Sequence, residues 1–202
     1  MSDYPLIDEL VSTFKAEGRI VIVGASLAGL RAAEALRDEG FTGSLTIIGD
    51  EVHEPYDRPP LSKQVLKGWV PAGNTKLPRL RAIDADWRLG VAATRLDRDN
   101  REVVLANGDK VPYDRLLIAT GVRSRAWFNP EERKLKGLYT LRTSDDAAKI
   151  QEAFKARPKR VLIVGAGFIG SEMASVCRDL GLDVTVAERS SAPLVGPLGG
   201  VI

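Results

Sequence analysis

The sequence predicts an α/β protein: a Rossmann-like FAD domain with an antiparallel hairpin insert, followed by an incomplete Rossmann-like NAD(P) domain. The main observation is an internal repeat, because "RIVIVGASLAGLRAAEALRDEGF" and "RVLIVGAGFIGSEMASVCRDLGL" align block for block. Each copy joins a buried-strand pattern to a helical pattern through a glycine-rich turn, which is typical of dinucleotide-binding units. Hairpin patterns lie between the copies, so one chain is expected to hold two dinucleotide sites.

The first copy is predicted to form a β-α-β unit. Residues 19–23 are a run of apolar and β-branched residues, as in a buried strand. Residues 27–39 place apolar side chains at helical spacing, and Gly40 follows as a stop signal. Residues 44–50 form a second strand pattern, close enough in sequence for a parallel unit.

The middle of the chain changes from loop to hairpin patterns. Residues 51–68 begin as a proline-rich loop, with a short helix expected after Pro60, and residues 69–86 show no regular pattern. Alternating apolar and polar residues then predict hairpins, with the tight turn at Asn107 and Gly108. Residues 115–121 are expected to form a buried strand that ends in a turn of small residues.

The second half begins with a predicted helix over 142–157, capped by Thr143 or Ser144. A complete β-α-β pattern follows over 160–189, and then only "SSAPLVGPLGGVI". We therefore expect the second domain to be incomplete, to need a missing C-terminal part or a second chain, and to hold FAD weakly on its own. The predicted divisions are a loose leader over 1–18, an FAD-binding domain over 19–143 and an NAD(P)-binding domain over 144–202.

Composition excludes several classes of function. Lysine and arginine number 29 against 27 acidic residues, so a net charge of +2 gives no argument for nucleic acid or an anionic membrane. No apolar run approaches the roughly 20 residues of a membrane span, and the acidic N-terminus is unlike a signal peptide. These features predict a cytoplasmic protein. One cysteine and one histidine argue against zinc and hydrolytic triads, which favours a borrowed cofactor.

The second glycine turn has the complete dinucleotide pattern, "GAGFIG", which spans Gly165, Gly167, Ile169 and Gly170. The three glycines permit the tight turn, the approach of the pyrophosphate and the close packing of the helix. Glu188 lies where a carboxylate binds ribose hydroxyls, and it repels a 2′-phosphate, so we expect NAD. The neighbouring Arg189 leaves NADP open.

The first turn has Gly24, Ser26 and Gly29, with Asp50 at the ribose position. Serine replaces the middle glycine, and its small side chain is compatible with a bond to a phosphate oxygen. An ordinary α/β packing turn without a ligand is the alternative for each copy.

The stretch "EPYDRPPLSK" resembles the flavin-side loop of FAD-dependent, NADH-using ferredoxin reductases, the reductase components of oxygenase and cytochrome P450 systems. The two glycine turns, "LLIATG", "LRTSDDA" and "GAGFIGSE" follow in the order of that family. The resemblance covers almost the whole chain from Arg19. It implies that FAD accepts electrons from NADH and passes them to a ferredoxin-type iron–sulfur protein.

The resemblance also implies roles for individual residues. Lys63 would lie near flavin N5, where a cation suits the arrival of hydride and negative charge. Glu172 would lie near the nicotinamide and Lys63, or it would only complement the helix dipole. Arg58 would form an ion pair or an FAD contact, or lie on the surface. Positions that would contact FAD are Gly24, Ala28, Gly29, Asp50, Ala93, Thr120, Gly121 and Arg142.

The absence of cysteine before position 177 separates the chain from relatives that use a thiol relay. Cys177 is expected to be a packed helical residue and His53 a loop residue. Electrons would then leave the flavin one at a time, as an iron–sulfur acceptor requires. The alternatives are an inactive or fragmentary nucleotide-binding piece, and another FAD/NAD(P)H reductase or NADH oxidase.

Overall fold

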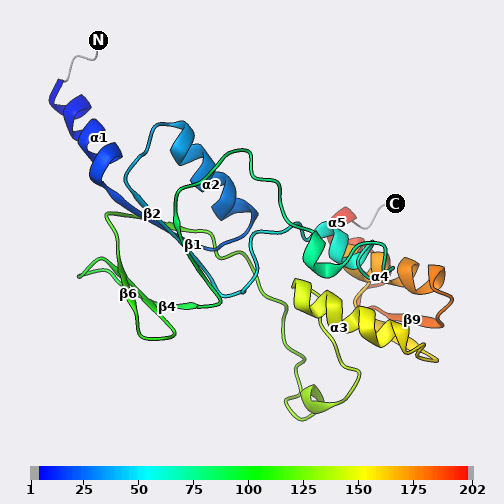
Figure 1. Cartoon of the computed structure of the whole chain (residues 1–202). Helices are drawn as coiled ribbons and strands as arrows, with labels where there is room; N and C mark the ends of the chain where they lie inside the picture. Colours follow the sequence, from blue (N-terminus) through cyan, green and yellow to red (C-terminus); the bar gives the residue numbers. More distant parts are fainter. Residues whose placement is uncertain (1–4, 200–202) are drawn as a thin grey trace. The chain divides into compact units, whose positions relative to one another are not determined.

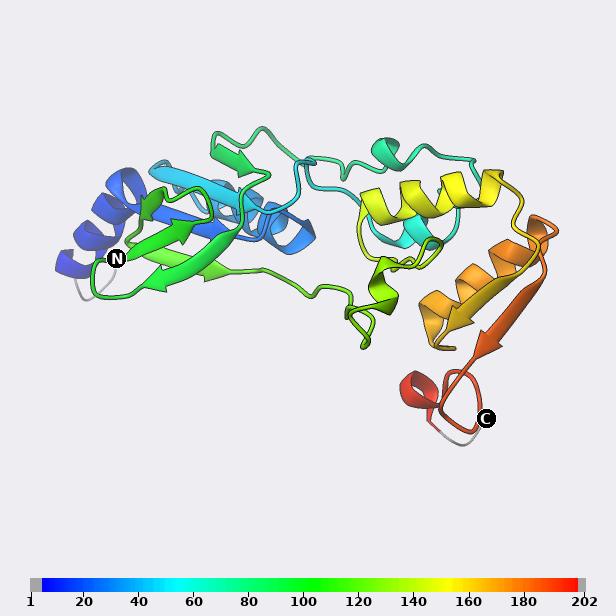
Figure 2. The same cartoon turned by 90° about the horizontal axis from the view of Figure 1, so that it is seen from below.

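The computed structural model describes residues 5–199 (Figures 1 and 2). In it, the first glycine turn lies at the carboxyl end of a central strand of a parallel sheet. The chain divides into two compact units, each described here by itself. The first comprises residues up to Tyr56 together with Lys76–Val122, and the second comprises Asp57–Thr75 together with the residues from Arg123 onward. The predicted division at residue 143, which concerns ligand binding, stays a prediction.

The first unit is built on a four-stranded parallel sheet with the strand order β3-β2-β1-β7. The strands are β1 (Arg19–Val23), β2 (Ser44–Gly49), β3 (Asp86–Leu89) and β7 (Arg115–Ile118). Helix α2 (Leu27–Asp38) joins β1 to β2, as the sequence predicts. The β3 strand was missed, because its "DWRL" stretch is only four residues long and pairs with β2 alone, at the end of the strand order.

Two layers cover this sheet. On one face, Leu30 and Ala33 of α2 pack with Ile20 and Ile22 of β1 in a buried cluster. The predicted hairpins form an antiparallel sheet of β4 (Ala93–Asp97), β5 (Glu102–Leu105) and β6 (Lys110–Pro112). Val103 and Val111 of this sheet are buried in a cluster with Val21 and Ile48 of the parallel sheet.

The expectation of a loose leader was wrong for residues 5–17, which form helix α1 (Pro5–Glu17). Phe14 packs against the core, with its ring centroid 5.9 Å from that of Phe41. The backbone carbonyl of Lys15 accepts hydrogen bonds from the amides of Thr42 and Gly43. The C-terminal turn of α1 is therefore anchored to the first unit.

The second unit contains the second glycine turn. Its regular elements are η1 (Pro59–Ser62), η2 (Ala72–Asn74), η3 (Glu132–Lys134), α3 (Ser144–Lys155), β8 (Val161–Val164), α4 (Phe168–Asp179), β9 (Val184–Ala187) and α5 (Val195–Leu198). Strands β8 and β9 pair in parallel. Thr143 is the N-cap of α3, because it forms a reciprocal capping box with Asp146. Cys177 is buried in α4, as expected.

The predicted fold class is confirmed: an α/β chain with a Rossmann-like sheet, a hairpin insert and a second, two-stranded β-α-β unit. Among residues 5–199, no helix combines the length and the apolar character that crossing a membrane requires.

Candidate functional site

The protein's own packing requires two of the positions in the first glycine turn. Gly24 has φ +124°, and a Cβ placed on it would lie 2.0 Å from the carbonyl oxygen of Ala119. A Cβ on Gly29 would lie 2.0 Å from the carbonyl oxygen of Gly24. Both glycines therefore let α2 begin directly against the ends of β1 and β7.

The middle position of the turn is different, because the fold does not require glycine there. Gly167 holds this position in the second turn, and a Cβ on it would meet no atom within 4 Å. Ser26 holds it in the first turn, where it is the N-cap of α2 but makes no side-chain cap hydrogen bond. The first amides of α2 and α4 have no partners within their helices, so each turn offers hydrogen-bond donors to an anion. The residues present therefore fit a dinucleotide pyrophosphate.

The other predicted FAD positions of the first unit follow the same edge of the sheet. The register pairs Val23 with both Ile48 and Ile118, so β1, β2 and β7 end side by side. Asp50 comes directly after β2, and Thr120 and Gly121 come after β7. Ala93 instead begins β4 of the hairpin sheet. The structure thus brings Gly24, Asp50 and Thr120 to one edge of the sheet.

The second turn is tied to the strand that follows it. Gly165 has φ +107°, and a Cβ on Gly170 would lie 2.0 Å from the Gly165 carbonyl oxygen. One oxygen of the Glu188 carboxylate accepts from the Ser190 amide at 2.8 Å and the other from the Ala166 amide at 2.7 Å. These backbone hydrogen bonds, that of Ser190 first, lower the pKa of Glu188 to about 2. Glu188 is therefore a fixed carboxylate beside the predicted NAD turn.

Lys63 and Glu172, which are 109 positions apart in sequence and were predicted to be catalytic, are in direct contact in the second unit. The Lys63 Nζ lies 2.7 Å from Oε1 of Glu172, and it also donates to the Pro59 carbonyl at 3.1 Å. The side chain of Glu172 is 33% exposed and that of Lys63 is 40% exposed. The ion pair is consistent with the predicted proximity of the two residues, and the role of Glu172 toward the nicotinamide stays a prediction.

Ser62 is a third member of this cluster, and sequence reasoning quoted it in a motif without giving it a role. Its hydroxyl donates to Oε2 of Glu172, the oxygen that Lys63 does not pair with, and the residue is 5% exposed. Burial acts to raise the pKa of Glu172, but the hydrogen bonds from Lys63 and Ser62 and the charge of Lys63 outweigh it, so the pKa is lowered. We call Ser62, Lys63 and Glu172 the carboxylate cluster.

The local sequence explains this geometry. Pro59 and Pro60 fix two successive φ angles, which favours the tight 3₁₀ turn of η1. Ser62 and Lys63 are consecutive at the end of that turn, so one short segment supplies a donor to each oxygen of Glu172. Glu172 itself lies in the first turns of α4, close after the Gly165–Gly170 loop.

Two further predicted FAD residues, Arg58 and Arg142, meet in the second unit. The Arg58 guanidinium donates to the backbone carbonyl of Arg142 at 2.9 Å. The Arg142 amide in turn donates to the carboxylate of Asp146, at 3.0 Å. The segment before η1 and the segment before α3 are therefore held together at these two arginines.

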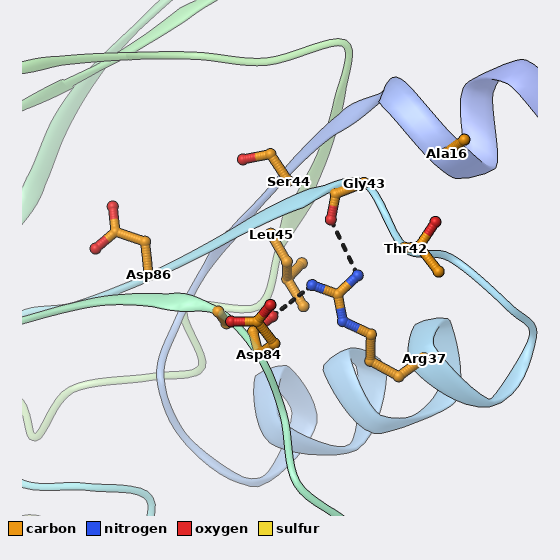
Figure 3. Close-up of a pocket in the computed structure, with 9 residues that line it drawn as sticks. Ala16, Arg37, Thr42, Gly43, Ser44, Leu45, Asp84 and Asp86 are labelled. Carbon is orange, nitrogen blue, oxygen red and sulfur yellow. Dashed lines mark hydrogen bonds between the residues drawn. The ribbon is translucent and has the colours of Figure 1, made fainter.

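A separate pocket of about 340 Å³ lies at the opposite edge of the first unit's sheet. Figure 3 shows Arg37 pointing across it, with hydrogen bonds to the backbone carbonyls of Gly43 and Asp84. Ser44 and Leu45 at the amino end of β2 line it. Ligands of open α/β sheets bind outside the carboxyl ends of the strands, so this pocket is not the dinucleotide site.

Replacing Ser62 with alanine is expected to raise the pKa of Glu172, because the carboxylate loses one of the donors that stabilise its charged form. Since the lowered pKa belongs to the folded state, the stability contributed by Glu172 is present at neutral pH and is lost as the pH falls through the folded pKa. The variant should lose this contribution at a higher pH than the wild type. An NMR titration of the Glu172 carboxyl carbon measures the shift, and Ser62→Thr, which keeps the hydroxyl, should behave as the wild type. An unchanged titration in Ser62→Ala would contradict the role of the hydroxyl.

Comparison with known proteins adds independent information. The family model for pyridine nucleotide-disulphide oxidoreductases matches residues 18–199. The chain is 38% identical to rhodocoxin reductase of Rhodococcus erythropolis over 91% of this chain and 43% of that protein. It is 39% identical to the ferredoxin–NAD(+) reductase subunit of the benzene 1,2-dioxygenase system of Pseudomonas putida, over 89% of this chain and 44% of that protein.

Solved structures give the same picture. The covalent putidaredoxin reductase–putidaredoxin complex contains a chain that matches with a TM-score of 0.77 and 33% identity, over 85% of this chain and 42% of that chain. The sequence therefore spans less than half the length of the relatives that it matches.

Proposed function

Because the chain belongs to the pyridine nucleotide-disulphide oxidoreductase family, we propose that it is the nucleotide-binding part of a reductase that passes electrons from NADH through FAD to a ferredoxin-type iron–sulfur protein. The acceptor would serve an oxygenase or a cytochrome P450; the names of two similar proteins connect those proteins with a benzene 1,2-dioxygenase system and with the CYP199A2 system. The proposal places the protein in the cytoplasm.

The observation that carries the proposal is the carboxylate cluster, which joins the "PPLSK" turn to the helix of the second glycine loop. Resemblance assigns that turn to the flavin side and that helix to the nicotinamide side. The Lys63 ammonium and the Glu172 carboxylate, 2.7 Å apart, form a charged pair between these two segments. The resemblance expects the flavin and the nicotinamide to lie close to this pair. The buried Ser62 hydroxyl satisfies the second carboxylate oxygen of Glu172, so both oxygens of this carboxylate are held.

Each residue then has a distinct part. The Gly24 loop, with Asp50, would hold the FAD pyrophosphate and ribose, and the Gly165 loop, with Glu188, would hold NAD. Bound FAD supplies the conversion between two-electron and one-electron transfer. The Lys63 ammonium, paired with Glu172, would provide positive charge, while Ser62 holds the carboxylate in one orientation.

The family name includes disulphide chemistry, but this chain's cysteine does not fit a thiol relay. Cys177 is the only cysteine of the 202 residues, and it is buried in α4. Burial raises the pKa of its thiol, which disfavours the reactive thiolate. An acceptor that takes single electrons therefore remains the better proposal.

The test is an absorbance spectrum of the purified chain with FAD, before and after NADH is added without oxygen. Flavin bands that NADH bleaches and that oxidised ferredoxin restores support the proposal. Bands that only oxygen restores favour an NADH oxidase. No bound flavin at any FAD concentration favours a non-enzymatic nucleotide-binding piece.

A further inference from the structure

The segment from residue 123 to residue 139, between β7 and α3, carries five basic and two acidic side chains. We call it the basic loop. It contains η3, the short 3₁₀ helix that precedes α3 in Figures 1 and 2. Arg125, Arg133 and Lys136 are all exposed. The predicted function gives no role to this loop.

Its two acidic residues are already engaged inside the loop. The Glu132 carboxylate accepts from Trp127 Nε1 and, at 2.9 Å, from Asn129 Nδ2. Glu131 forms an ion pair with Lys134 at 2.9 Å. These contacts leave a surplus of positive charge directed to solvent.

The same contacts give the loop a defined shape. Arg133 Nε donates to the backbone carbonyl of Trp127, which closes the chain over η3. The rings of Trp127 and Phe128 pack with centroids 4.8 Å apart. A loop that is ordered by its own side chains loses less conformational entropy when a partner binds.

Apolar side chains lie among these charges. Phe128 is 77% exposed and Leu135 is 62% exposed. Scattered exposed apolar residues are normal, but a large aromatic residue beside several cations has the composition of an interface centre with a charged rim.

We propose that the basic loop is a docking surface for an acidic protein, namely the iron–sulfur acceptor of the proposed function, on which this inference rests. Positive charge at the rim would steer an acidic partner into encounter, and Phe128 would provide the apolar contact at the centre. An electron-transfer encounter needs only a small interface, because the complex must also separate rapidly.

The experiment measures binding of putidaredoxin, the protein in the compared complex, to the full 202-residue chain by surface plasmon resonance at low and high salt. The double variant Arg125→Glu/Lys136→Glu is expected to bind about tenfold more weakly, mainly through a slower association rate. Phe128→Ala is expected to dissociate several-fold faster. Putidaredoxin whose carboxylates have been amidated should not bind.

The matched control is Arg98→Glu/Lys159→Glu, which changes the net charge equally at exposed positions outside the loop. Equal weakening in both double variants would overturn the inference, since only total charge would then matter. Normal binding by the loop variants would overturn it too, and so would a wild type that binds anionic vesicles but not putidaredoxin. The proposed function is judged separately, by the bleaching of flavin with NADH, which does not require docking. Unchanged thermal unfolding shows that the variants fold.

Discussion

Replacing Gly24 with alanine is expected to lower the free energy of unfolding of the first unit by about 3 kcal/mol or more, from backbone strain and overpacking together. The backbone at Gly24 has φ +124°, which L side chains rarely adopt. The added Cβ would also lie 2.0 Å from the Ala119 carbonyl oxygen. Ala119 follows β7, and its amide donates to the carbonyl of Val23 on β1, so the clash cannot be relieved without separating these strands.

Urea denaturation followed by circular dichroism measures this loss. Gly108→Ala is the matched control, because its φ is +92° but a Cβ there would meet nothing within 4 Å. The control should lose only the strain contribution, about 1 kcal/mol. Gly165→Ala, with φ +107° and open space around it, should resemble the control. Equal losses at Gly24 and Gly108 would contradict the packing argument.

This comparison also explains why serine at position 26 is compatible with the fold. The first and third glycines of the turn are required by contacts within the protein, at Gly24 and Gly29. The open space at Gly167 shows that the middle position is not constrained in this way. Any demand for glycine there would come from a ligand that approaches the backbone closely.

The sequence predicted most of the fold because the main signals are local and repeated. Both β-α-β units have apolar, β-branched strand sequences followed by glycine turns, and Thr143 marks the start of α3. The β3 strand was missed because it is only four residues long and its pairing with β2 is a long-range contact. Helix α1 was missed because the acidic residues near its start were weighed only as evidence against a signal peptide. The helical spacing of its apolar residues was not considered.

The site shows a similar division. Spacing and resemblance predicted the glycine turns and Lys63 as site residues, but the hydrogen bond from Ser62 to Glu172 joins residues that are 110 positions apart. Such a contact depends on how η1 meets α4, and no local pattern in either segment encodes it. Serine within a known motif is the only sequence signal that pointed to this position.

Replacing Lys63 with methionine is expected to lower NADH-dependent reduction of ferricyanide by about 100-fold, with FAD supplied, because removal of one preorganised charged donor typically costs that much. Methionine keeps an unbranched apolar stem of similar length and removes the charge. The expected loss of stability is small, below about 1 kcal/mol, because the ion pair with Glu172 is more than one-third exposed on the lysine side. A large loss of rate with a small loss of stability is therefore the signature of a functional charge.

The matched control is Lys67→Met in the same segment. Lys67 also forms an ion pair, with Asp179 at 2.5 Å, and it lies over the Trp69 ring at 4.5 Å. The Lys67→Met variant should therefore lose about as much stability as Lys63→Met, and it should keep the wild-type rate of ferricyanide reduction. Glu172→Gln keeps the shape of the side chain and removes its charge, while Lys63 keeps its own. This variant therefore shows whether the reaction rate depends on the Lys63 charge alone or on the ion pair with Glu172. A rate for Lys63→Met within threefold of the wild type would reduce the carboxylate cluster to a structural contact between η1 and α4.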